Sequence, residues 1–201
     1  MSTKTASTDH PVHALVAERW SPYAFADKPV DPDDLASLFE AARWAASSYN
    51  EQPWRWIVAQ REDQGAFGRL LSTLVEANQN WARHAPVLAV GVTITAFSRN
   101  GKPNKAAHHD LGLAAGNLSF EAASRGIAVH QMIGIEPQRV RDLYGVPDDA
   151  EPLTALAIGY PGESGDTPEG MRDRDTAPRT RKPLGELVFA GAWGHRAAFT
   201  S

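Results

Sequence analysis

Apolar residues recur at helical spacing in two long segments of the chain. The first begins with Asp31 and Pro32, a pair typical of a helix start, and continues with the apolar stripe Leu35, Leu38, Phe39 and Ala42. The second runs over residues 110–125, and its small and apolar positions are Leu111, Ala114, Ala115, Leu118 and Ala122. We expect Asp110 to cap this second helix and Gly126 to end it.

Four segments have the composition of strands. Residues 87–94 form an uninterrupted apolar run, which is typical of a strand covered on both faces. The other three are residues 56–59, 127–132 and 153–160. Shorter helices are expected over residues 13–19, 67–77 and 136–144. Because strands and helices interleave without the regular spacing of a doubly wound nucleotide fold, the pattern indicates an α+β or α/β protein.

The two ends of the chain differ from its middle. Residues 1–12 are polar and are expected to form a flexible N-terminal arm, whereas residues 13–162 hold all the predicted core elements and form one domain. Residues 163–182 are rich in charge, Gly and Pro, as in a linker that crosses a surface. Apolar residues then return, so residues 163–201 are expected to form an arm that packs on a partner subunit.

Composition excludes several classes of function. The 201 residues carry a formal net charge of -4, which argues against nucleic acid as a partner. No apolar span is long enough for a transmembrane helix, and the N-terminus has no apolar signal region, so a cytoplasmic protein is expected. The absence of Cys excludes disulfides, thiolate catalysis and Cys-ligated metal centres. Any redox chemistry therefore requires a bound cofactor, and no metal site is expected.

Residues 47–54 contain an unusual concentration of polar groups. Ser47, Ser48, Asn50 and Gln52 bring two hydroxyls and two carboxamides into one short turn between a helix and a strand. Such groups are poor core material because each one needs a hydrogen-bond partner if it is buried. They suit the wall of a pocket for a flat ligand rich in heteroatoms. The alternative is a capped turn in solvent.

Cations occur near both ends of the chain. Arg19 and Ser21 follow the first predicted helix, and Arg179 and Arg181 lie in the polar linker. Guanidinium groups and a hydroxyl that converge would bind a phosphate. Sequence alone does not show that they converge, and a solvated basic patch at Arg179 and Arg181 is the alternative.

Two further segments place polar groups beside predicted strands. Asn78 precedes the long apolar strand and either contacts the edge of a heterocycle or caps a helix. Residues 131–134 follow a strand and lead into a helix, where backbone groups meet a polar ligand or form an ordinary loop.

Taken together, these segments resemble the nitroreductase family of FMN-dependent NAD(P)H oxidoreductases. The resemblance spans about residues 13–190, and its four blocks occur in the family's order: residues 19–25, 47–54, 110–118 and 179–184. It implies an α+β fold with a central mixed β-sheet flanked by helices. It also implies an interlocked homodimer with FMN at the interface.

The resemblance assigns roles to individual residues. Arg19, Ser21, Arg179 and Arg181 would hold the ribityl phosphate, with Trp20 and Tyr23 in the same segment. The groups expected near the flavin from the partner subunit are Ser47, Ser48, Asn50 and Gln52. Those expected along the ring and ribityl chain are Asn78, Gln131, Met132, Ile133 and Gly134. Trp54 and Trp81 would shape a pocket for the electron acceptor, and no side chain is expected to act as a classical acid or base.

The implied activity is a ping-pong cycle. Hydride passes from NAD(P)H through bound FMN to a nitroaromatic, a quinone or a similar small acceptor. Two alternatives are an FMN-binding regulatory or storage protein with little turnover, and a same-fold enzyme with other flavin chemistry, such as dehalogenation or flavin fragmentation. The motifs report FMN binding and do not separate these possibilities.

Overall fold

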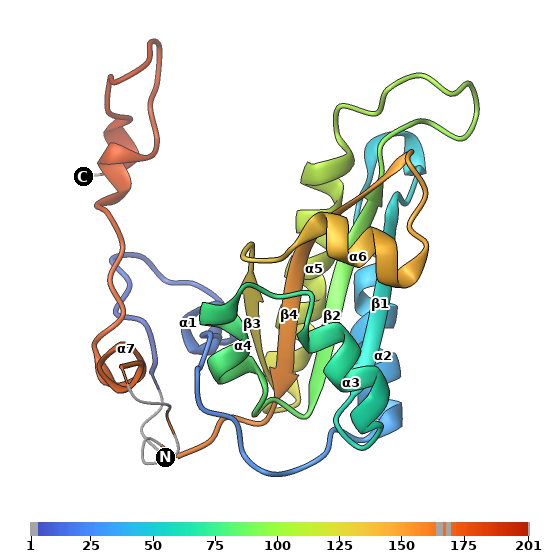
Figure 1. Cartoon of the computed structure of the whole chain (residues 1–201). Helices are drawn as coiled ribbons and strands as arrows, with labels where there is room; N and C mark the ends of the chain where they lie inside the picture. Colours follow the sequence, from blue (N-terminus) through green and yellow to red (C-terminus); the bar gives the residue numbers. More distant parts are fainter. Residues whose placement is uncertain (1–3, 164–166, 168–169, 201) are drawn as a thin grey trace.

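One four-stranded sheet lies at the centre of the chain. The structure is a computed structural model that describes residues 4–163, 167 and 170–200. Its strands occur in the order β1-β2-β4-β3 (Figure 1). Their bounds are Trp54–Gln60 for β1, Val87–Ile94 for β2, Ala128–Met132 for β3 and Ala150–Gly159 for β4. The predicted run at residues 87–94 is therefore confirmed without a change of boundary.

The α+β class is confirmed, whereas the sheet is antiparallel at every described pairing rather than mixed. A parallel strand would have to come from a segment outside these four. The C-terminal arm, residues 184–200, stands away from the sheet of its own chain (Figure 1).

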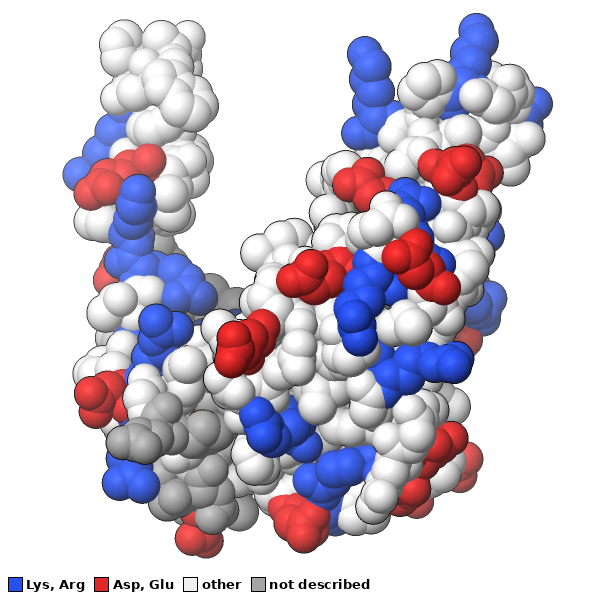
Figure 2. Space-filling view, in the orientation of Figure 1, with Lys and Arg blue, Asp and Glu red and all other residues white. Residues whose placement is uncertain are grey.

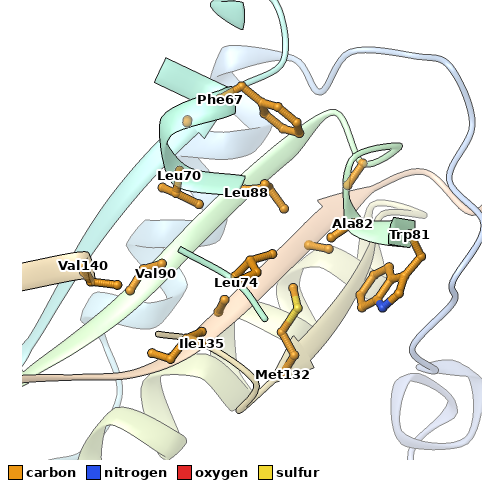
Figure 3. Close-up of a cluster of buried hydrophobic side chains, with 14 of the residues drawn as sticks. Phe67, Leu70, Leu74, Trp81, Ala82, Leu88, Val90, Met132, Ile135 and Val140 are labelled. Carbon is orange, nitrogen blue, oxygen red and sulfur yellow. The ribbon is translucent and has the colours of Figure 1, made fainter. Parts of the chain in front are cut away.

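Helices cover both faces of the sheet. Successive residues of the central strand, β2, point to opposite faces, so each layer of helices packs on alternate residues of that strand. Val87 and Ala89 face one layer, formed by α2 (Pro32–Arg43) and α5 (Ala107–Ser124). Leu88 and Val90 face the other layer, formed by α3 (Gln64–Leu71), α4 (Glu76–Ala82) and α6 (Pro137–Tyr144). Figure 3 shows this second cluster. Such a strand has no solvent side, and this explains its uninterrupted apolar sequence.

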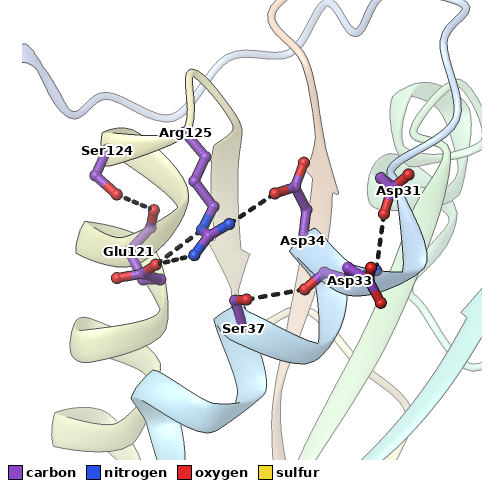
Figure 4. A network of polar contacts seen from close by, with 7 residues as sticks. All are labelled: Asp31, Asp33, Asp34, Ser37, Glu121, Ser124 and Arg125. Atoms are coloured by element: carbon purple, nitrogen blue, oxygen red, sulfur yellow. Dashed lines mark hydrogen bonds and ion pairs between the residues drawn. The ribbon is translucent and has the colours of Figure 1, made fainter.

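Polar contacts fix the ends of the α2–α5 layer (Figure 4). Oδ1 of Asp31 accepts the N–H of Asp33 at 2.8 Å, so Asp31 is the N-cap of α2 as predicted. Arg125, just after α5, reaches Asp34 at 2.8 Å and Glu121 at 2.7 Å. Exposed pairs of this kind contribute only about 0–1 kcal/mol each, so they orient the helices more than they stabilise them.

Two predicted helix boundaries were wrong. The helix expected over residues 67–77 is two helices, α3 and α4, because the chain between them bonds to the loop before α6: the carbonyl of Thr73 accepts the N–H of Glu136 at 2.7 Å. The long helix α5 begins at Ala107 rather than at Asp110. Asp110 does not cap it, because its carboxylate accepts the N–H of Ser48 at 3.0 Å instead.

Short elements occupy the two ends of the described chain. They are α1 (Ala14–Glu18), α7 (Arg172–Thr176), η3 (Leu184–Glu186) and η4 (Ala198–Thr200), while another short element, η1 (Ser48–Asn50), lies between α2 and β1. Residues 1–3 of the predicted N-terminal arm, and residues 164–166, 168–169 and 201 of the predicted C-terminal segment, lie outside the described residues. Within the described part of the chain, no helix is both long and apolar enough to cross a membrane.

Candidate functional site

The predicted cations from the two ends of the chain converge. Arg19 ends α1, and its Nη1 lies 3.3 Å from Oγ of Ser21. Burial lowers the pKa of Arg19, and the charges of Arg179 and Arg181 lower it further. Burial, and then the charge of Arg181, lowers the pKa of Arg179. Arg179 donates to the carbonyl of Ala17, two residues before Arg19, so these two guanidiniums meet at the same end of α1, and the charge of Arg181 acts on both.

Arg179 also joins the cluster to the N-terminal segment. Its Nη1 donates to the carbonyls of Lys4, at 2.9 Å, and of Ala17. The ammonium of Lys4 lies 4.8 Å from the ring centroid of Trp20. Among the ion pairs of the described residues, none involves Arg19, Arg179 or Arg181. A positive centre therefore forms from Lys4, Arg19, Arg179 and Arg181, and an anion would neutralise it.

A carboxylate and a histidine hold the turn that carries Ser21, and the sequence did not single out either. Asp175 of α7 accepts the backbone N–H groups of Tyr23 and Ala24, each at 3.0 Å. On the other side, Nδ1 of His130 in β3 donates to the carbonyl of Pro22 at 2.8 Å. No local pattern marks these residues, because each acts on a backbone group more than 100 residues away.

The turn at residues 47–52 has a strained backbone. Tyr49, Asn50 and Gln52 have φ angles of 54°, 56° and 50°, in the left-handed region that residues with a Cβ rarely adopt. Oγ of Ser47 accepts the N–H of Gln52 at 3.0 Å, and Asp110 holds Ser48 from α5. Strain of this kind persists where surrounding contacts enforce it, and it gathers at functional sites.

A loop after β2 lies against this turn. Oε1 of Glu51 accepts the N–H of Ser98 at 2.7 Å, and this bond lowers the pKa of Glu51. The rings of Tyr49 and Phe97 meet edge to face at 5.7 Å. The guanidinium of Arg99 lies 4.0 Å from the centroid of Tyr49. The strained turn thus has an exposed aromatic and cationic rim.

The segment at residues 131–134 and Asn78 are brought together. Nδ2 of Asn78 donates to the carbonyl of Gly134 at 3.0 Å, and Asn78 lies inside α4 rather than at its C-cap. Gln131 donates to Oγ of Ser119 at 3.0 Å. Met132 is buried in the core, whereas Ile133 is 73% exposed. Only part of this segment therefore presents side chains to a ligand.

Trp54 and Trp81 are core residues in this structure. Trp54 is 6% exposed in the α2–α5 layer, and Trp81 is 1% exposed in the opposite layer. Trp81 packs against Tyr23 at 5.0 Å and His130 at 4.4 Å. Neither indole forms the wall of an open pocket, contrary to the role expected for them. These large rings bury much apolar surface, and this burial stabilises the packing of the helical layers on the sheet.

Most of the chain is similar to known proteins. The sequence model of the nitroreductase family matches residues 16–160. The chain belongs to the nitroreductase family. It is 31% identical over 192 residues to Protein DrgA of Synechocystis sp., covering 80% of this chain and 89% of the relative. It is 27% identical over 165 residues to an NADH dehydrogenase of Thermus thermophilus, covering 68% and 80%.

Solved structures share the fold of this chain. The crystal structure of an oxidoreductase containing FMN superposes with a TM-score of 0.89 at 29% identity, covering 98% of this chain and 100% of the other. A nitroreductase family protein from Streptococcus pneumoniae gives a TM-score of 0.67 at 22% identity, covering 88% and 98%. These structures therefore share the fold of this chain over most of its length.

Proposed function

We propose that this nitroreductase family protein binds FMN and uses it to transfer hydride from NAD(P)H to a nitroaromatic, quinone or similar small acceptor by a ping-pong mechanism. The observation that carries the proposal is that Arg179 reaches the end of α1 where Arg19 lies beside Ser21, while the charge of Arg181 acts on both guanidiniums. A similar protein of known structure contains FMN, and a relative is named an NADH dehydrogenase. When bound, FMN supplies the redox chemistry.

The residues present fit a phosphate ester. Burial lowers the pKa of Arg19 and of Arg179, and repulsion from neighbouring guanidiniums, Arg181 among them, lowers both further. A dianion that enters among these groups relieves the repulsion and is bound more tightly for it. Ser21 adds a hydroxyl that donates to a phosphate oxygen. Among the described residues, no acidic side chain pairs with these three cations. The protein's part is to bind and orient the cofactor at this end.

The proposal includes a homodimer in which each flavin touches both chains. Within one chain, the cation cluster packs beside β3, through His130, whereas the turn at residues 47–52 leads into β1. These strands are the opposite edges of the sheet, roughly 14 Å apart at about 4.8 Å a strand. We expect residues 47–52 of a second chain to approach a flavin that is held by the cations of the first chain.

Exposed apolar surface supports the same assembly. Trp193 is 91% exposed, Phe199 is 74% exposed, and both lie on the C-terminal arm. In Figure 2 the upper part of this arm is largely uncharged, and an open gap separates it from the body of the protein. Apolar side chains on an extended arm are buried when a partner fills such a gap.

The visible spectrum of the purified protein tests the proposal. A flavin spectrum that bleaches on anaerobic addition of NADH or NADPH is expected, and screening of nitroaromatics and quinones then identifies the acceptor. A flavin that stays oxidised with both nucleotides would favour the binding or storage role instead. A protein that neither contains FMN nor takes up added FMN would contradict the cofactor assignment.

A further inference from the structure

Asp175 connects two segments that are 152 residues apart in sequence. Its Oδ1 accepts the N–H of Tyr23 at 3.0 Å, and its Oδ2 accepts the N–H of Ala24 at 3.0 Å and lies 3.4 Å from the hydroxyl of Thr167. Asp175 is 7% exposed. A buried carboxylate is costly unless hydrogen bonds satisfy it, and here backbone donors and a hydroxyl do so.

This carboxylate is the buried residue of α7. The helix has five residues, and its other side chains are exposed. A helix this short has almost no stability of its own. Asp175 therefore attaches α7 to the body, together with Arg174, whose Nη1 donates to the hydroxyl of Tyr23 at 3.0 Å, and with Met171, which packs against the core just before the helix.

The position of Asp175 in the chain relates it to the cation cluster. Tyr23 lies shortly after Arg19 and Ser21, while Arg179 and Arg181 lie shortly after Asp175. The bond between Asp175 and the Tyr23 turn therefore sets where the two halves of the cluster meet. Arg179 then continues along the N-terminal segment by donating to the carbonyl of Lys4 at 2.9 Å.

Electrostatics gives the attachment a second role. The guanidiniums of Arg19, Arg179 and Arg181 repel one another, and this repulsion favours separation of the linker from the turn. The negative charge of Asp175 acts in the opposite sense, since it raises the pKa of Lys4 against the lowering effects of burial and of Arg179. Asp175 thus bonds the two segments and also opposes the effect of Arg179 on Lys4.

We propose that Asp175 is a positioning residue that holds Arg179 and Arg181 beside Arg19 so that the cluster binds the phosphate of the flavin. The carboxylate itself stays on the backbone of Tyr23 and Ala24 and does not contact the ligand. This inference rests on the proposed FMN site and specifies which residue outside it assembles the site.

Two variants of the same helix test the proposal. Asp175→Asn and Asp173→Asn each remove one negative charge from α7, but only the first removes the carboxylate bonded to the turn, because Asp173 is exposed. The dissociation constants for FMN and for riboflavin, which lacks the phosphate, are measured by flavin fluorescence. Asp175→Asn is expected to weaken FMN binding by about tenfold or more, because charged hydrogen bonds hold the segment. Riboflavin binding should change by less than about twofold, as should both affinities in Asp173→Asn.

The outcomes separate this inference from the proposed function. If the unaltered protein fails to bind FMN, the flavin site itself is wrong. If it binds FMN and Asp175→Asn binds it equally well, the flavin site stands and the positioning role is wrong. An equal loss for FMN and riboflavin would also overturn the role, because it indicates general disruption. Should Asp175→Asn not fold by circular dichroism, Asp175→Glu keeps the charge one methylene farther out. It should still weaken FMN selectively, and unchanged FMN affinity would reject the role.

Discussion

Nδ1 of His130 donates a hydrogen bond to the carbonyl oxygen of Pro22, 2.8 Å away. The imidazole also packs against Tyr23, with ring centroids 4.6 Å apart, and against Trp81. Strand β3 therefore holds the turn before Tyr23 from one side, while Asp175 holds its backbone from the other. The site that gathers Arg19 and Ser21 is fixed between a sheet edge and the C-terminal linker.

The half-buried His130 predicts a pH dependence of stability. Burial lowers the pKa of His130 from 6.5, the bond to Pro22 and the charge of Asp175 oppose the lowering, and Arg19 adds to it. The unfolded chain thus binds a proton at pH values where folded His130 stays neutral. The free energy of unfolding should fall as the pH drops through about 6.5, and the loss from this group should end below the folded pKa.

Urea unfolding between pH 7.5 and pH 5.5 measures this dependence. His130→Gln removes the titration and keeps a donor for Pro22, so its stability should vary less over that range than that of the unaltered protein. His84→Gln changes an exposed histidine and serves as the control. Equal slopes for the protein and for His130→Gln would contradict the prediction.

Arg181→Ala should weaken flavin binding without destabilising the apo protein. FMN affinity should fall by about tenfold, since a hydrogen bond to a charged group contributes about 1.5–3 kcal/mol. The stability of the apo protein should be unchanged or slightly higher, because Arg181 lowers the pKa of both Arg19 and Arg179 by repulsion. Flavin titration and thermal unfolding check the two effects. Arg69→Ala, on the exposed side of α3, is the control, and unchanged FMN affinity in Arg181→Ala would remove Arg181 from the phosphate site.

Gly134 lies too close to α4 to accept a side chain. A Cβ atom there would lie 2.5 Å from Nδ2 of Asn78 and 2.9 Å from Cγ2 of Val75. Gly134→Ala should displace Asn78 and lower the free energy of unfolding by about 1–3 kcal/mol. In contrast, Gly68→Ala in α3 meets no atom within 4 Å and should raise it by about 0.5–1 kcal/mol. Chemical denaturation distinguishes the two, and a stable Gly134→Ala would show that Asn78 moves without cost.

The exposed apolar side chains of the C-terminal arm predict a dimer. Replacement of both Trp193 and Phe199 by Ala should weaken the dimer, because these side chains are 91% and 74% exposed in the single chain. Sedimentation measures the dissociation constant. Trp44→Ala, which removes a ring that is 73% exposed at the end of α2, should leave the dimer intact. A monomer that retains stoichiometric FMN would contradict the proposed assembly.

Local patterns in the sequence determined much of the fold. The apolar run of β2 and the Asp31–Pro32 start of α2 were predicted with their boundaries, because each depends on neighbouring residues alone. The polar turn at residues 47–52 and the cations at both ends also stand out in the sequence, and their order led to the nitroreductase family.

Tertiary structure decided which of these residues meet. Burial of Trp54 and Trp81 depends on how the helical layers close over the sheet, and composition does not specify that. The antiparallel sheet and the use of Asp110 on Ser48 follow from pairing between distant segments. The same is true of Asp175, whose partner Tyr23 lies 152 residues away. Such contacts depend on the packed shape of the whole chain, so local periodicity and capping signals did not contain them.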